Sequence, residues 1–204
     1  MAEDFSTTIA GHDLEYIDDG HIYLVDGVIV PSITTIVRTT DPDKYSTVSE
    51  AVLKKAADMG TAVHEAVEAW AMSGTDSDMP EVRGFRFLQK HYRFAVEAVE
   101  VPVILFRDTE PVAAGRLDLL LRNPDGQRGL GDIKRTSALD KNSLAYQLNL
   151  YRIAYQQSYG EKIDFLAGVH LREDVRKYVP IPVVEELAEE LINKYFEHYE
   201  EGKE

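Results

Sequence analysis

Two short stretches of this sequence place charged side chains where β-strands are expected. Gly115-Arg116-Leu117-Asp118 and Gly131-Asp132-Ile133-Lys134 both lie in apolar, β-prone surroundings, with turn residues between them. Alternate residues of a strand point to the same face, so Asp132 and Lys134 should project together, and Asp118 could reach the same place. Two carboxylates and an ammonium are costly to bury, and they suit a divalent cation bound by oxygen ligands beside a lysine that contacts a phosphate or a water molecule. The pattern predicts phosphodiester hydrolysis.

The elements that must position these groups follow from apolar periodicity and turn residues. We expect a β-hairpin unit at 15–30, a short helix at 34–37 capped by Ser32, one long helix or two helices broken near Gly60 at 47–72, a helix at 81–97, strands at 99–107, 111–122 and 128–136, a helix at 141–159, strands at 163–171 and 175–181, and a helix from Val183. This order predicts an α/β (α+β) fold with a central mixed β-sheet flanked by helices. One domain, 1–204, is expected, with segments 1–40, 41–98, 99–182 and 183–204.

Further residues extend the charged triplet to a pattern of four parts. In chain order these are Gly60-x-x-x-His64, Gly115-x-x-Asp118, Gly131-Asp132-x-Lys134 and Gln147-x-x-x-Tyr151. The pattern resembles the PD-(D/E)xK nuclease superfamily, in particular its RecB-like and Cas4-like exonuclease branch. The segment 30–37 also resembles one that precedes this core in phage nucleases and mitochondrial genome-maintenance exonucleases. The chain departs from the family pattern where Leu117 stands in place of proline and Asp132 in place of glutamate.

The resemblance implies a restriction-endonuclease-like core and a role for each matching residue. His64, Asp118, Asp132 and the Ile133 carbonyl would bind Mg²⁺ or Mn²⁺. Lys134 would orient or help to deprotonate the attacking water, Gln147 would position Lys134 or the water, and Tyr151 would contact a DNA phosphate. Glu100 is a candidate for an additional acid near the metal. Many relatives carry a four-cysteine iron–sulfur cluster, which this chain cannot build because it has no cysteine.

Ordinary roles compete with these assignments. A lone histidine such as His64 is more often a surface or core-edge residue than a ligand. Asp118 and Asp132 could form an exposed carboxylate pair, and Gln147 and Tyr151 could be helix-surface residues. The apolar segments around both aspartates and the order of the four parts favour the site.

A formal net charge of −14 at first argues against a polyanionic partner. Much of the excess acid lies after residue 184, whereas basic residues outnumber acidic ones between residues 111 and 152. The candidate DNA-contacting residues there are Arg116, Arg135, Lys141, Tyr151 and Arg152.

The leading prediction is therefore a Mg²⁺- or Mn²⁺-dependent deoxyribonuclease, which we expect to be an exonuclease. It would act on single-stranded DNA or duplex ends in recombination, repair or phage DNA metabolism. Phage or host recombination proteins are the expected partners. The alternative is a catalytically inactive accessory module with the same fold that binds DNA or protein. A third possibility is a nuclease that acts on RNA, which the sequence does not distinguish from one that acts on DNA. The N-terminus lacks the basic and apolar regions of a signal peptide. We expect a cytoplasmic protein of a bacterial or phage-infected cell that is neither secreted nor membrane-bound.

Overall fold

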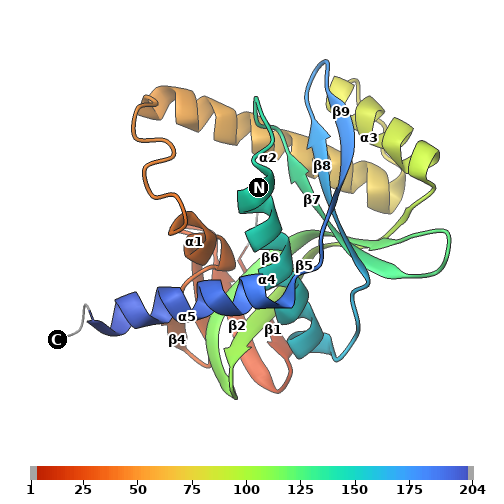
Figure 1. The fold of residues 1–204 in the computed structure, drawn as a ribbon. Coiled ribbons are helices and arrows are strands. Elements are labelled where there is room, and N and C mark those ends of the chain that lie inside the picture. Colours follow the sequence, from red (N-terminus) through yellow and green to blue (C-terminus); the bar gives the residue numbers. More distant parts are fainter. Residues whose placement is uncertain (1–3, 202–204) are drawn as a thin grey trace.

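The computed structural model describes residues 4–201, with side chains described as far as residue 197 (Figure 1). Its elements, in chain order, are β1 Phe5–Ile9, β2 His12–Ile17, β3 Ile22–Val25, β4 Val28–Val30, α1 Ile33–Arg38, α2 Glu50–Ser73, α3 Pro80–Tyr92, β5 Ala95–Arg107, β6 Glu110–Arg122, β7 Arg128–Lys134, α4 Lys141–Tyr159, β8 Phe165–Leu171, β9 Arg176–Ile181 and α5 Glu185–Glu201.

A five-stranded mixed sheet, in the order β5-β6-β7-β8-β9, forms the centre of the fold. All neighbouring strands are antiparallel except β7 and β8, which run parallel and are joined by the α4 crossover. Buried side chains of α2 and α3 form one hydrophobic core with the sheet, and those of α1, α4 and α5 form a second. The expected central mixed sheet flanked by helices is confirmed.

A second sheet of four antiparallel strands, β1 to β4, lies at the N-terminal end of the described chain. It packs against the long β5–β6 hairpin through a third core that includes Ile104 and Ala114. The β3–β4 turn is made by Asp26 and Gly27, which both have positive φ, the conformation that a tight two-residue hairpin requires. The sequence pattern predicted the hairpin unit at 15–30 and missed β1.

Two helix boundaries differ from the expectation. Gly60 does not interrupt α2, which continues to Ser73 and ends where Gly74 adopts the left-handed conformation. The helix predicted at 81–97 ends instead at Tyr92, because Arg93 is left-handed and directs the buried Phe94 into the core. Strand β5 therefore begins at Ala95 and not at residue 99. Among residues 4–201, no helix combines the length and apolar character of a membrane span.

Candidate metal centre

Strands β6 and β7 bring the two aspartates together. The strands pair antiparallel with Leu119 opposite Gly131, which places Asp118 beside the end of β7. There Asp118 Oδ2 accepts a 2.7 Å hydrogen bond from the backbone N–H of Ile133. Asp132 is 2% exposed, and its Oδ2 lies 2.6 Å from Lys134 Nζ. The two carboxylates and the ammonium converge as the alternation of side chains along a strand predicts.

Helix α2 adds His64 to this group. Val63 and Val67 are fully buried against the sheet, which sets the rotation of the helix. His64 Nε2 lies 3.0 Å from the Ile133 carbonyl oxygen, to which it must donate because a carbonyl only accepts. Its Nδ1 lies 3.6 Å from Asp118 Oδ2. Nδ1 is therefore the nitrogen that remains for a cation, and the Ile133 oxygen still has a second lone pair.

Helix α4 carries Gln147 to the same place. The helix is capped by Asp140, whose side chain accepts from Ser143 N at 3.0 Å, and Leu144 is buried against the sheet. Gln147 Nε2 donates to Asp132 Oδ1 at 2.5 Å. Gln147 thus holds the Asp132 carboxylate, whereas the expectation was that it would position Lys134 or water.

Tyr151 lies one turn further along α4 and is 5% exposed. Its ring packs on Gly115, where a Cβ atom would come within 3.0 Å of the Tyr151 hydroxyl. Burial, together with the negative groups of Asp118 and Asp132, raises the pKa of Tyr151 well above its usual range. The hydroxyl therefore stays protonated and can act only as a neutral donor or acceptor.

Burial controls the charges of the central pair. It raises the pKa of Asp132 to about 6, although the Lys134 ammonium opposes the shift. Burial also works against the charge of Lys134, but the carboxylates of Asp132 and Asp118 outweigh it and raise the pKa of Lys134. Lys134 Nζ lies 2.6 Å from Asp132 Oδ2, so the ammonium is the partner of this buried oxygen.

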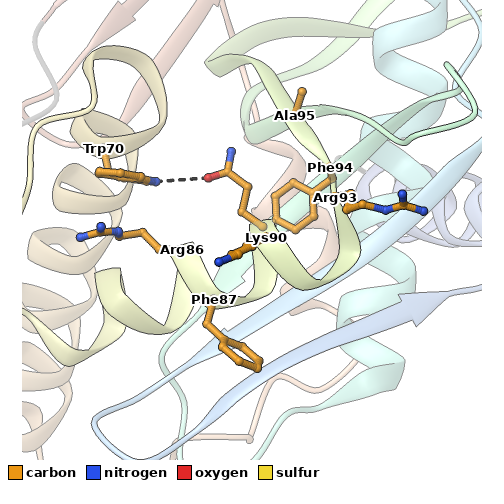
Figure 2. Close-up of a pocket in the computed structure, with 8 residues that line it drawn as sticks. Trp70, Arg86, Phe87, Lys90, Arg93, Phe94 and Ala95 are labelled. Carbon is orange, nitrogen blue, oxygen red and sulfur yellow. Dashed lines mark hydrogen bonds between the residues drawn. The ribbon is translucent and has the colours of Figure 1, made fainter.

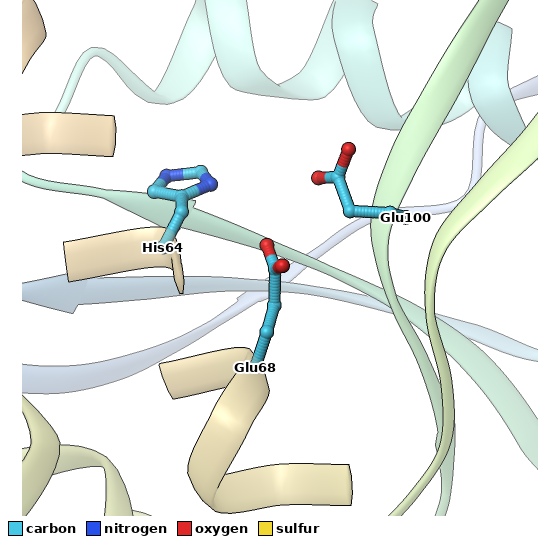
Figure 3. A group of neighbouring side chains, drawn as sticks. All are labelled: His64, Glu68 and Glu100. Atoms are coloured by element: carbon cyan, nitrogen blue, oxygen red, sulfur yellow. The ribbon is translucent and has the colours of Figure 1, made fainter. Parts of the chain in front are cut away.

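Two glutamates extend the site beyond the aspartates. His64, Glu68 and Glu100 each offer an atom within 4.8 Å of the other two, and Figure 3 shows their side chains pointing toward one another from α2 and β5. Burial, together with the charge of Glu100, raises the pKa of Glu68 to about 7. Glu100 adopts φ +48 within β5, an uncommon conformation for a residue other than glycine.

Glu68 was missed from the sequence, although it stands four residues after His64 and must share its helix face. With it, the site offers carboxylates, a backbone carbonyl and one imidazole. Hard oxygen donors suit Mg²⁺, and an imidazole shifts the preference toward Mn²⁺. The residues present fit a divalent metal ion.

Most of the predicted DNA-contacting cations are instead held by partners inside the protein. Arg116 Nε lies 3.0 Å from Glu100 Oε2, Arg135 Nε lies 2.9 Å from Oε1 of the buried Glu81, and Arg152, 4% exposed, has Nη1 3.5 Å from Glu185 Oε1. Arg116 also stacks over the ring of Tyr16 at 4.6 Å. Lys141 is exposed in the first turn of α4. Of the four cations, only Lys141 has no ion-pair partner among the residues that the structure describes, so it can meet a phosphate without first leaving one.

Comparisons with known proteins add little to this geometry. No protein-family model matches the chain, and no curated protein matches it. Among the solved structures that are similar is one described as the crystal structure of SSO0001, at 17% sequence identity and a TM-score of 0.44, over 80% of this chain and 74% of that one. A similarity of this size carries no argument about function, which has to come from the site itself.

Proposed function

We propose that this protein is a Mg²⁺- or Mn²⁺-dependent nuclease that hydrolyses phosphodiester bonds in DNA, most simply at ends or in single strands. The observation that carries the proposal is the buried carboxylate of Asp132, which has a lysine ammonium 2.6 Å from one oxygen and the Gln147 amide bonded to the other. Asp118, His64 and the Ile133 carbonyl surround the same point. A charged group this deep is expensive unless it serves chemistry.

Different residues of the site would have different roles in this reaction. Asp118, Asp132, His64 Nδ1 and the Ile133 carbonyl would hold the metal ion, with Glu68 and Glu100 beside them. A bound ion of this kind lowers the pKa of water and offsets charge on a phosphate. Lys134, kept protonated by the two aspartates, can hydrogen-bond the attacking water or a phosphate oxygen. Gln147 keeps Asp132 in place, since its amide is bonded to the carboxylate.

Strict dependence on metal follows from the charge of the site. Asp118 and Asp132 lie beside Lys134, and Glu68 and Glu100 lie beside His64, in a chain of net charge −14. A phosphate approaching that group meets like charge, so substrate binding near Lys134 requires a cation. Arg116 does not relieve the repulsion fully because it is already paired with Glu100.

The test is digestion of end-labelled single-stranded, double-stranded and circular DNA with Mn²⁺, compared with EDTA. We expect cleavage only with metal, and the product pattern separates exonuclease from endonuclease action. Lys134→Ala should abolish cleavage of all three DNA substrates. Lys162→Ala is the matched control, because Lys162 also pairs with an aspartate but lies exposed, far along the chain from the site. Full activity of Lys134→Ala, or robust activity in EDTA, would refute the mechanism.

A second measurement addresses the metal without activity. Calorimetric titration should detect Mn²⁺ binding to the wild type, and Asp118→Asn should lose it because a ligand carboxylate becomes an amide. A protein that binds Mn²⁺ and DNA but cleaves neither linear nor circular DNA or RNA would instead be an accessory binding module.

A further inference from the structure

A hollow of about 650 Å³ lies between the last turns of α2 and the outer face of α3, away from the aspartates. Figure 2 shows Trp70 and Arg86 on one side of it, with Lys90 and the ring of Phe94 across from them. The volume falls within the range of about 300–1,000 Å³ that is common for ligand sites. Nothing in the proposed reaction uses these side chains.

This surface is basic on an acidic protein. From residue 82 to 96 and from residue 175 to 184 the sequence contains no aspartate or glutamate. The same segments carry Arg83, Arg86, Lys90, Arg93, Arg176 and Lys177. Of these, Arg86 is paired with Asp76 at 2.7 Å, and Arg83 donates to the Asp78 carbonyl oxygen. Lys90 and Arg93 are exposed, and neither has an acidic partner among the described residues. Two lone cations in a hollow attract an anion and give it a fixed place to bind.

Aromatic rings lie among these cations. Phe87 is 48% exposed with the Arg176 guanidinium 4.3 Å above it, and Tyr92 is 43% exposed and stacks on Tyr178 at 4.5 Å. Trp70 lies under the Arg86 guanidinium at 4.2 Å. Each ring already has a neighbour on it: Arg86 on Trp70, Arg176 and His91 on Phe87, and Tyr178 on Tyr92. Rings interleaved with cations are the combination that single-stranded nucleic acids bind, because the cations follow the phosphates while bases stack on the rings once such a neighbour moves aside.

We propose that the surface formed by Trp70, Arg86, Phe87, Lys90 and Arg93 is an accessory binding site for a single strand of DNA. The choice of DNA as ligand rests on the proposed function. Trp70 follows His64 by six residues on α2, about 9 Å of helix rise, so the hollow and the metal centre lie along the same helix. Duplex DNA binds less tightly, because its bases are stacked on each other and cannot stack on Trp70 or Phe87.

The chain provides its own probe, since Trp70 is its single tryptophan. Titration with an oligothymidylate in EDTA should quench the Trp70 fluorescence without cleavage. The double variant Lys90→Gln, Arg93→Asn should weaken binding by about tenfold and reduce the salt dependence by about 1.4 in log–log slope, the value for two lost phosphate contacts on a single strand. Asparagine is chosen because position 93 has φ +54. Phe87→Ala should weaken binding with the salt slope unchanged.

The matched control is Arg38→Gln with Lys194→Gln, which changes the net charge equally. Both residues are exposed on α1 and α5, and those helices pack on the opposite side of the sheet from α3. Near-ultraviolet circular dichroism establishes that each variant keeps the fold. Equal weakening by the control pair, no quenching by the oligothymidylate, or equal quenching by polyglutamate would each overturn the proposal.

Failure of this site and failure of the proposed nuclease are separable. Lys134→Ala should bind the oligothymidylate as the wild type does, since the hollow excludes Lys134. Quenching by single strands without any cleavage would refute the nuclease and retain the binding site. Cleavage that is unchanged in the Lys90→Gln, Arg93→Asn variant, together with no quenching of Trp70 fluorescence by the oligothymidylate, would refute the binding site and retain the nuclease.

Discussion

Replacing Asp132 by asparagine should abolish cleavage and yet leave the metal-free protein as stable as before or more stable. The folded protein carries a carboxylate whose pKa burial raises from 3.8 to about 6. That difference, at about 1.4 kcal/mol per pH unit, corresponds to about 3 kcal/mol lost above pH 6 when the buried group ionises. Asparagine removes this penalty and keeps the shape of the side chain.

The stability gained by Asp132→Asn is reduced because Lys134 loses its ion pair with Asp132. Without Asp132 the ammonium has only Asp118 nearby, but its side chain is 29% exposed and can be hydrated. We therefore expect a change of between about 0 and 3 kcal/mol in favour of Asp132→Asn at pH 8. An acid with a raised pKa favours the folded state while protonated and loses that advantage as pH rises. The difference between variant and wild type should thus grow from pH 4 and level off above pH 6.

Urea unfolding in EDTA across this pH range measures the effect. The matched control is Glu81→Gln, since Glu81 is equally buried and paired with Arg135 at 2.9 Å but lies outside the metal centre. Glu81→Gln should keep cleavage and lose about 1–3 kcal/mol, because it leaves a partly buried guanidinium without its partner. A loss of stability in Asp132→Asn at pH 8 that exceeds the error of the measurement, or normal cleavage by it, would refute the reasoning.

Three further changes test other parts of the site. Glu68→Gln should flatten the pH dependence of the free energy of unfolding in EDTA between about pH 4.5 and 7. The reason is that the Glu68 carboxyl, whose pKa burial raises to about 7, is no longer there to ionise. An unaltered pH profile would show that Glu68 is not buried as described. Gly115→Ala should destabilise the fold by about 1–3 kcal/mol and lower the cleavage rate, since its Cβ would come within 3.0 Å of the Tyr151 hydroxyl. Thermal unfolding and cleavage rates of Gly115→Ala are compared with those of Tyr151→Phe. Wild-type stability of Gly115→Ala would show that Tyr151 does not pack on Gly115. Arg116→Gln should lower urea stability by about 1–2 kcal/mol through loss of the 3.0 Å pair with Glu100, and an unchanged midpoint would contradict that role.

Local patterns in the sequence predicted much of the fold. The bounds of α4 are those expected from its apolar spacing, and Ser32 caps α1 through the N–H of Thr35 as its residue type indicates. The shared face of Asp132 and Lys134 follows from the alternation of side chains along a strand. Local rules failed at 93–98, where Arg93 ends the helix because Phe94 is needed in the core.

The sequence by itself determined which residues could do chemistry, because a carboxylate, a lysine and a histidine at given spacings are visible without coordinates. Only the tertiary structure decided which charges are available, because their partners are distant in sequence. Arg135 pairs with Glu81 and Arg116 with Glu100, so neither is a free contact for DNA. Glu68 and Glu100 meet only when α2 packs beside β5. The raised pKa values likewise depend on burial, a property that comes from packing.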